Sequence, residues 1–278
     1  MMRPTRFLLA RLLITFCLAV CLARPVLASE ISSTDSTADQ DSQETELKTK
    51  VAGRYAHYDI VAYTAKILFW EMRTLVITYG VTEFKLDDTG RLLSSSRYCH
   101  ASHKSNFPFK SEVPDAFTRA IIPRDAWVEI RRDQDGLSLW RPETPTPIGI
   151  RMEDPDQPLP TDPRDPRIAD DDGDGKPGVT VKIRLYDRFD TELYIARREI
   201  FAYALRPQTD GTLGGYVSDH SEQLILGSPF PPLRKQNAPT QNPDKNLSPI
   251  LLVPIDDSYD CEKVMEERDN LFPAEPDA

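Results

Sequence analysis

Apolar and polar residues alternate along most of the apolar segments of this chain, a pattern typical of β-strands that bury one face. The clearest example is Val179–Leu185, in which every second residue is Val, Ile or Leu and the positions between are Thr, Lys and Arg. Leu75–Val81 alternates in the same way, and the turn sequence at 87–90 would connect it to a return strand at Leu92–Cys99. The sequence therefore predicts antiparallel hairpins.

Further strand candidates occur throughout the chain. They are Tyr55–Tyr63, Lys66–Met72, Ala126–Arg131, Glu192–Ile195, Phe201–Leu205, Gly215–Val217, Gln223–Leu226 and Pro249–Pro254. The span Glu192–Leu205 also fits a helix, because several of its apolar residues recur at helical spacing, and Cys261–Asn270 is the best helix candidate. Strands without a regular alternation with helices favour an all-β fold, either a single antiparallel barrel of the calycin type or a sandwich.

Proline marks where the strands cannot be. Many of the 24 prolines lie in two long segments, 141–174 and 228–249. Because proline lacks a backbone N–H and fixes φ, neither segment can form a central strand or a long helix. We therefore expect one β domain at 51–265 with two long proline-rich loops, a short C-terminal helix, and a C-terminal tail at 266–278.

Residues 1–28 have the features of a secretory signal peptide. Two arginines precede an apolar stretch, and a Val-Leu-Ala sequence that ends at Ala28 suits cleavage. Arg11 divides the apolar stretch, which is then shorter than the roughly 20 residues that a membrane-spanning helix needs. We expect no membrane span in the mature chain.

A lipoprotein anchored through Cys21 is the alternative, because the residues before it resemble a bacterial lipobox. Val20 stands where that pattern has a small residue. The polar segment 29–50 has almost no large apolar side chains, so it is predicted to be a disordered leader. We expect the protein to be periplasmic or extracellular.

The mature chain is strongly acidic. The full sequence has 34 basic and 44 acidic side chains, and four of the arginines lie in the signal peptide, so cleavage changes the net charge from −10 to −14. Such a chain has no positive excess with which to bind nucleic acid or anionic membranes. The charge suits a protein that attracts cations, and its partner is expected to be a small ligand or an envelope component.

Cys99 and Cys261 are the cysteines that remain outside the signal peptide. In an oxidising compartment such a pair predicts one disulfide between an early strand and the C-terminal segment. A zinc site is the alternative, because His100 and His103 follow Cys99 closely. That set lacks a fourth ligand, and it would prevent the disulfide.

The segment 170–178 has the spacing of a calcium loop. Asp170, Asp172 and Asp174 occupy alternate positions, and Gly175 permits a sharp bend after them. The backbone carbonyl of Lys176 would be a further ligand. Three clustered carboxylates repel one another unless a cation lies among them, so the sequence predicts bound Ca²⁺. Asp165, Asp187, Asp190 and Glu192 are candidates for the remaining ligand.

This segment resembles the Asp-x-Asp-x-Asp-Gly loops of dockerins, thrombospondin type 3 repeats and EF-hands. The resemblance implies that the three aspartates and the Lys176 carbonyl bind calcium. Val181 stands where an EF-hand has a bidentate glutamate, so an EF-hand proper is not expected. Together with the strand that follows, the loop also resembles a set of uncharacterised secreted bacterial proteins, which brings no activity with it.

Several aromatic residues gather near the start of the β domain. Gly53-Arg54-Tyr55 resembles the opening Gly-x-Trp of lipocalin-type barrels, with tyrosine in place of tryptophan. Tyr55, Tyr58, Tyr63 and Trp70 would line a ligand pocket if they faced the interior of a barrel, and ordinary core packing explains them equally well.

Three functions fit these features. The first is a secreted or envelope β-domain protein that calcium stabilises and that has no catalytic activity. The second is a barrel that binds a small apolar or sugar ligand, and the third is a secreted hydrolase with a calcium-dependent site near the acidic loop. Asp219-His220-Ser221 contains the residue types of a catalytic triad, but neighbours on a strand face opposite ways and cannot converge.

Overall fold

The computed structural model of this chain describes residues 34–67, 70–236 and 240–278, with side chains omitted at 34–38, 66–67 and 70. The predicted signal peptide and Cys21 lie outside these residues. Residues 1–39 and 40–278 form separate compact units, and of the first unit only the start of one helix is described. The second unit contains the sheet and everything that follows.

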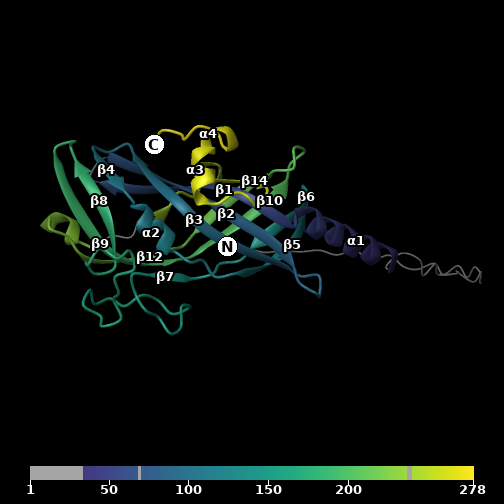
Figure 1. The fold of residues 1–278 in the computed structure, drawn as a ribbon, viewed down its shortest axis with the longest axis horizontal. Coiled ribbons are helices and arrows are strands. Elements are labelled where there is room, and N and C mark those ends of the chain that lie inside the picture. Colours follow the sequence, from purple (N-terminus) through teal and green to yellow (C-terminus); the bar gives the residue numbers. More distant parts are fainter. Residues whose placement is uncertain (1–33, 68–69, 237–239) are drawn as a thin grey trace, which may run out of the picture. The chain divides into compact units, whose positions relative to one another are not determined.

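The sheet contains fourteen strands, and all of their pairings are antiparallel. The strands are β1 (Gly53–Ile67), β2 (Trp70–Leu86), β3 (Leu92–Ser105), β4 (Phe109–Glu112), β5 (Ala126–Asp133), β6 (Gly136–Arg141), β7 (Thr146–Ile148), β8 (Val179–Leu185), β9 (Phe189–Glu199), β10 (Phe201–Pro207), β11 (Leu213–Asp219), β12 (Glu222–Gly227), β13 (Thr240–Gln241) and β14 (Pro249–Ile255). This confirms the all-β prediction (Figure 1).

Helices are few and mostly short. They are α1 (Thr34–Val51), α2 (Asp115–Ala120), α3 (Cys261–Glu266) and α4 (Arg268–Leu271), with 3-10 turns η1 (Pro231–Arg234) and η2 (Lys245–Leu247). Among the residues that the structure describes, no helix is long and apolar enough to cross a membrane. The expected C-terminal helix is present as α3 and α4, and the helical alternative for Glu192–Leu205 is wrong, because this span forms β9 and β10.

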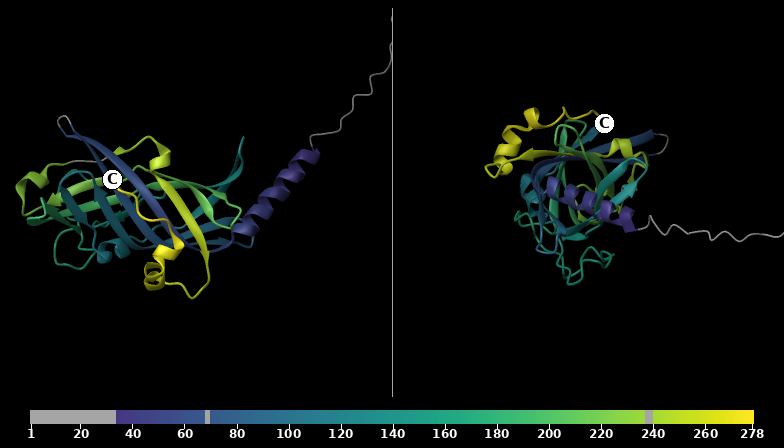
Figure 2. Two further views of the ribbon diagram at one scale, coloured as in Figure 1. Left: turned by 90° about the horizontal axis from the view of Figure 1, so that it is seen from above. Right: turned by 90° about the vertical axis from the view of Figure 1, so that its right-hand side faces the viewer.

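Eight strands pair in a closed ring. Their order is β3-β2-β1-β14-β11-β10-β6-β5, and β5 pairs again with β3 through Leu92–Ser94. We call these strands the ring. Tyr203, Leu139 and Leu252 are among the residues of its buried apolar core. In the end-on view of Figure 2, the strands curve around this interior while the C-terminal helices lie outside it.

The remaining pairings continue the sheet from the far end of β3. Ser102 pairs with Glu112 of β4, and the order then runs β4-β8-β9-β12, with β7 also paired to β9. We call β4, β7, β8, β9 and β12 the side sheet. Its apolar residues form a second core together with Phe117 of α2. Every second residue from Val179 faces this core, as the alternation predicts.

A β-bulge lies where β3 passes from the ring to the side sheet. Tyr79 pairs with His100 but its neighbour Gly80 pairs with Tyr98, so Cys99 is the extra residue. A bulge of one residue exchanges the faces of the strand beyond it. Tyr98 before the bulge and Ala101 after it therefore both face inward, and Cys99 faces outward.

The disulfide between Cys99 and Cys261 is present, with 5.2 Å between their Cα atoms. It ties the bulge of β3 to the first residue of α3. From there Val264 and Phe272 pack on the outer face of β1 and β2, where Phe272 stacks on Tyr58 with 5.4 Å between ring centroids. The predicted tail at 266–278 therefore includes α4 and a buried contact to the sheet.

Residues 34–50 form most of α1, where the sequence predicts a disordered leader. Two contacts explain why the part of α1 from residue 40 onward, which belongs to the second unit, is an ordered helix. Leu47 and Val51 are buried in the core of the ring, and Gln43 accepts a hydrogen bond of 2.9 Å from Arg132 of β5. Lys48 and Lys50 in the last turn also suit the negative end of the helix dipole. Packing, more than local composition, fixes this helix.

Candidate functional site

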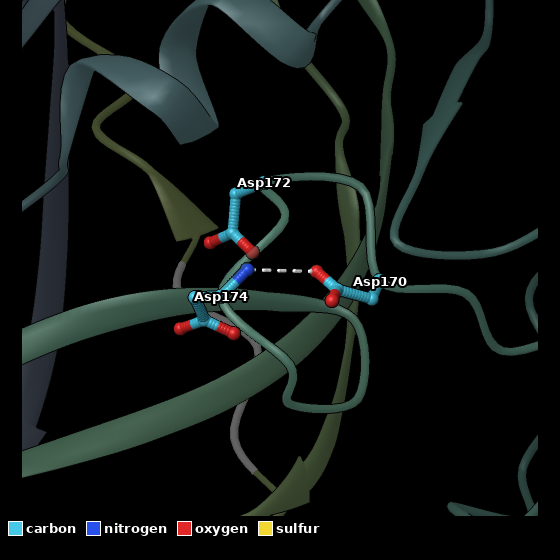
Figure 3. A group of neighbouring side chains, drawn as sticks. All are labelled: Asp170, Asp172 and Asp174. Carbon is cyan, nitrogen blue, oxygen red and sulfur yellow. Dashed lines mark hydrogen bonds between the residues drawn. The ribbon is translucent and has the colours of Figure 1, made fainter.

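The three aspartates of the acidic loop lie together. One carboxylate oxygen each from Asp170, Asp172 and Asp174 falls within 4.8 Å of the others (Figure 3). Gly175 has φ +81°, in the left-handed region that glycine adopts without strain, so the bend occurs where the sequence predicts it. This group could hold a metal ion.

Backbone N–H groups organise the loop around Asp170. Its carboxylate accepts hydrogen bonds from Gly175 at 2.8 Å, Gly173 at 2.8 Å and Asp174 at 3.2 Å. These bonds, that of Gly175 foremost, lower the pKa of Asp170, so the loop holds this residue as an anion.

Asp172 is the least satisfied member of the cluster. Its Oδ2 atom accepts a hydrogen bond of 2.8 Å from the backbone of Thr180, while its Oδ1 atom is buried and has no hydrogen-bond partner among the described residues. Burial raises the pKa of Asp172, and the nearby carboxylates of Asp174 and Asp170 add to the effect. A cation at this position would remove both penalties.

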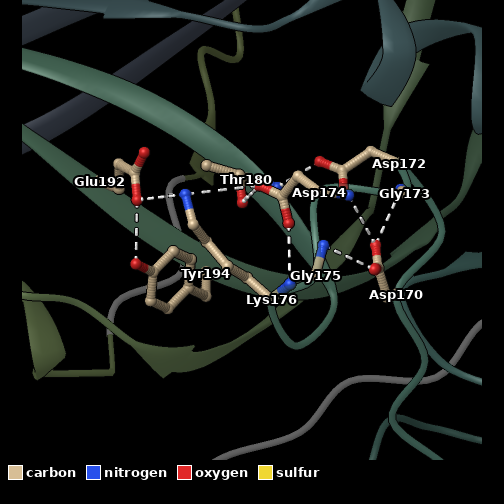
Figure 4. A network of polar contacts seen from close by, with 9 residues as sticks. All are labelled: Asp170, Asp172, Gly173, Asp174, Gly175, Lys176, Thr180, Glu192 and Tyr194. Carbon is tan, nitrogen blue, oxygen red and sulfur yellow. Dashed lines mark hydrogen bonds and ion pairs between the residues drawn. The ribbon is translucent and has the colours of Figure 1, made fainter.

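Lys176 places its own positive charge beside the cluster. Its ammonium group lies 2.6 Å from Glu192 and 3.6 Å from Asp174 (Figure 4). Tyr194 donates a further hydrogen bond of 2.9 Å to Glu192. Glu192 is therefore connected to the cluster through Lys176.

The other three candidates for the remaining ligand are engaged elsewhere. Asp165 pairs with Arg167, Asp187 with Lys110 and Asp190 with Arg184. Glu192 is the candidate that an ion pair with Lys176 connects to the loop.

The loop is attached directly to the side sheet. The hydroxyl of Thr180 donates to Asp174 at 2.6 Å, and its backbone N–H donates to Asp172, so two of the aspartates hold the start of β8. Gly178, just before β8, has φ +82°, and a Cβ atom here would lie 2.2 Å from the carbonyl oxygen of Ile195 in β9. The loop and the β8–β9 hairpin therefore form one tightly packed body.

The zinc alternative at Cys99 is wrong, because that cysteine forms the disulfide. His100 and His103 have other partners: the Nδ1 atom of His100 lies 2.7 Å from Asp115, and that of His103 lies 2.9 Å from Ser111. If the residues of β3 simply alternated from Tyr98 onward, His100 would face inward and His103 outward. The bulge reverses both orientations.

The aromatic residues of the predicted pocket do not share one surface. Tyr55 and Tyr63 belong to the core of the ring, whereas Tyr58 packs outside under the C-terminal helices. The side chain of Trp70 lies outside the described part of the chain. Of the three placed tyrosines, Tyr63 lines a cavity.

This cavity has a volume of about 620 Å³ and lies between the ends of β1–β3, the side sheet, α2 and η1. Its walls are mainly apolar, with Val61, Val76, Phe117, Val181, Ile183 and Ile195 among the lining side chains. The alternate apolar residues of β8 that the sequence predicted to share one face thus form part of the wall.

A cluster of polar side chains lies along one part of the wall, and all of its members except Ser221 line the cavity. Arg197 and Glu199 pair through two hydrogen bonds, of 2.6 and 3.1 Å. Ser221 donates to Glu199 at 3.0 Å and also contacts Asp219, which accepts a hydrogen bond of 2.6 Å from Tyr63. We call these five residues the polar cluster.

Burial and mutual pairing set the ionisation of the polar cluster. Burial opposes charge on Glu199, but the guanidinium of Arg197 outweighs it and lowers the pKa of Glu199. Burial and the charge of Glu199 raise the pKa of Asp219, whereas Arg197 only partly offsets them. The two carboxyl groups are therefore pushed in opposite directions: Glu199 stays an anion, and Asp219 is the one that takes up a proton more readily.

His103 adds a neutral imidazole to the same cavity. Burial, and then the charge of Arg197, lower the pKa of His103 to about 4, although Glu199 acts in the opposite direction. The unfolded chain binds a proton at this residue below about pH 6.5, and the folded chain does so only near pH 4. Stability contributed by neutral His103 is thus complete above pH 6.5 and is lost as the pH falls toward 4.

We expect acidification from pH 6.5 to 4 to cost the wild-type protein about 2 kcal/mol more unfolding free energy than it costs the His103→Gln variant. The expected value is smaller than the full pKa difference would give, because the imidazole of His103 borders a cavity. Urea unfolding at a series of pH values measures the difference. Parallel curves for the two proteins would contradict the assignment of this pH dependence to His103.

Sequence reasoning missed the polar cluster. Arg197 and Glu199 occupy alternate positions of β9 and continue the inward-facing series of Leu193 and Ile195. Charged residues at the end of an apolar alternation were the available signal, but they are equally typical of a strand that emerges into solvent. Asp219 and Ser221 share a face, while His220 points away and contacts Glu143, as the argument against a triad requires.

Comparison of the chain with protein-family models, curated proteins and solved structures gives no match. The site is therefore interpreted from its own geometry.

Proposed function

We propose that this protein binds a small apolar molecule in this cavity, and that a calcium ion in the acidic loop stabilises the wall of the cavity. The observation that carries the proposal is the cavity itself. Its volume of about 620 Å³ falls within the range of small-molecule sites.

The apolar lining supports an apolar occupant. Water in such a space needs two or more polar partners, and side chains such as Val61, Val181 and Ile183 offer none. Filling the cavity with an apolar molecule would remove this surface from water and contribute about 25 cal/mol for each Å² buried. The side chains of β8 and β9 would then contact the ligand directly.

Calcium is the ion that suits the acidic loop. Its donors are carboxylate oxygens, the ligands that hard cations prefer, and the loop brings three of them close together. The buried and unpaired Oδ1 atom of Asp172 supports a bound cation. Through Thr180, the same aspartates hold the first residues of β8, so the ion would stiffen the strand that forms one wall.

Diphenylhexatriene, an uncharged hydrocarbon whose fluorescence rises in apolar surroundings, tests the proposal. We expect saturable binding to the wild-type protein with one site for each chain. Ile183→Trp, which fills the cavity from β8, should weaken binding at least tenfold. Lys182→Trp provides the matched control, because Lys182 directly precedes Ile183 in the same strand and is exposed on the opposite face.

The absence of saturable binding by wild-type protein would overturn the proposal. So would equal binding by the Ile183→Trp and Lys182→Trp variants, once thermal melts have shown that both are folded.

A further inference from the structure

The cavity opens to solvent beside η1. Among the described residues that line it, those that are themselves exposed are Pro232, Lys235 and Gln236, and all the others are buried or half-buried. These three residues lie in η1 or directly after it. We therefore place the mouth of the cavity at this segment.

The hairpin of β8 and β9 lies at the edge of this mouth. Leu185, the last residue of β8, lines the cavity and pairs with Phe189 at the start of β9. The aromatic groups of Phe189 and Phe230 lie 5.4 Å apart, centroid to centroid, and Phe230 directly precedes η1. The turn between β8 and β9 is thus held next to the mouth. Figure 1 shows this hairpin at the opposite end of the sheet from β5 and β6.

Two aromatic side chains of the hairpin project into solvent. Tyr186 is 69% exposed and Phe189 is 49% exposed, which places both among the few exposed large apolar residues of the described chain. Tyr186 also has φ +50°, in the left-handed region that residues other than glycine adopt at a cost. Packing does not offset this cost, because the side chain is exposed. The turn therefore presents an aromatic surface that stability of the fold does not require.

Three cations accompany these aromatic groups. Arg188 lies between them in sequence, and Arg234 and Lys235 lie at the mouth. All three side chains are exposed, and none forms an ion pair with a carboxylate of the described residues. Arg234 donates a hydrogen bond of 2.8 Å to the carbonyl oxygen of Ser228, which leaves its charge uncompensated.

The acidic residues nearest the turn are already paired. Asp187 lies 2.7 Å from Lys110, and Asp190 lies 2.6 Å from Arg184. The mouth therefore carries an excess of positive charge, although the chain as a whole is strongly acidic. At physiological ionic strength the Debye length is about 8 Å, so an approaching surface experiences these cations more than the remote carboxylates.

We propose that the rim of the cavity, which we define as Tyr186, Arg188, Phe189, Arg234 and Lys235, docks on the surface of an anionic lipid bilayer. Aromatic side chains favour the boundary between lipid headgroups and acyl chains, and cations add attraction to anionic headgroups. The acidic remainder of the molecule is repelled by the same surface, so the mouth is turned toward the lipid.

Docking in this orientation goes beyond ligand binding, because it identifies where the ligand comes from. An apolar molecule that leaves the bilayer at the mouth enters the cavity without crossing water, which opposes the exposure of apolar surface. That transfer rests on the proposed function, whereas the docking itself does not.

Cosedimentation with lipid vesicles tests the docking. We expect the wild-type protein to bind vesicles made of two parts phosphatidylcholine and one part phosphatidylglycerol at least tenfold more tightly than vesicles of phosphatidylcholine alone. The double variant Tyr186→Ser/Phe189→Ser should bind the anionic vesicles at least tenfold more weakly than the wild type. Arg188→Gln/Lys235→Gln should show a similar loss and a weaker dependence on salt.

Two double variants outside the rim are the matched controls. Leu86→Ser/Trp127→Ser removes two large apolar side chains that are 39% and 42% exposed. Arg97→Gln/Lys50→Gln removes two exposed positive charges. Once thermal melts have shown that all four variants are folded, both controls should bind the anionic vesicles as the wild type does.

The docking is overturned if the wild-type protein does not bind the anionic vesicles, if it binds neutral vesicles equally well, or if the rim variants bind like their controls. Self-association of the wild type that Tyr186→Ser/Phe189→Ser abolishes, without vesicle binding, would instead assign the rim to a contact between two copies of the chain. Neither aromatic residue of the rim lines the cavity. Binding of diphenylhexatriene without vesicles therefore tests the proposed function separately, and either result can fail alone.

Discussion

Replacement of Cys99 and Cys261 by alanine is expected to lower the unfolding free energy by about 5 kcal/mol. The two cysteines are separated by 162 residues in sequence. A cross-link that closes so long a loop removes much of the conformational entropy of the unfolded chain, and the loop-entropy relation gives about 5 kcal/mol at this length. Cys261 also begins α3, so its loss loosens the packing of the C-terminal helices on β1 and β2.

Chemical denaturation of the chain that begins at Ser29 measures this effect, because the other two cysteines of the sequence lie before that residue. Reductant should lower the transition midpoint of the wild-type protein and leave that of the double variant unchanged. Equal midpoints for the oxidised wild type and the variant would show that the disulfide does not contribute to stability.

Removal of calcium is expected to lower the melting temperature by about 10 °C. If the dissociation constant is micromolar and free calcium is millimolar, binding stabilises the folded state by about 4 kcal/mol. For a domain of this size each kcal/mol corresponds to about 2–4 °C. The expected change follows from the repulsion among Asp170, Asp172 and Asp174, which only a bound cation relieves fully.

Asp172→Asn and Glu153→Gln form a matched pair for this experiment. Both remove one carboxylate from the same long loop, but Glu153 is exposed and does not belong to the cluster. Calcium should raise the melting temperature of the wild type and of Glu153→Gln, and should have little effect on Asp172→Asn. A wild-type melt that does not respond to a chelator would disprove the calcium site. The ammonium group of Lys176 would then be the charge that offsets the cluster.

Local patterns in the sequence were sufficient where one short segment carries the whole signal. The alternation of Val179–Leu185 predicted which residues of β8 face inward, and the spacing of the aspartates predicted their convergence. The cysteine pair predicted the disulfide, because an oxidising compartment and an even number of cysteines leave few alternatives.

Features that depend on distant segments could not be predicted. The ring closes where Leu92–Ser94 pairs with β5, and neither segment carries a mark that identifies its partner. The bulge at Cys99 exchanges the faces of β3, so simple alternation would have placed Ala101 and His103 outside the cavity. The contacts of Leu47 and Val51 that hold α1 depend on the ring in the same way.

The position of the disulfide on the bulge has a consequence for the cavity. Residues of β3 before Cys99 close the ring, and residues after it, including Ala101 and His103, line the cavity. The covalent bond to Cys261 therefore fixes the corner at which the sheet divides, from the outer side of the wall. Reduction of that bond would free the corner to widen, so the redox state of one buried disulfide would alter the shape available to whatever lies within.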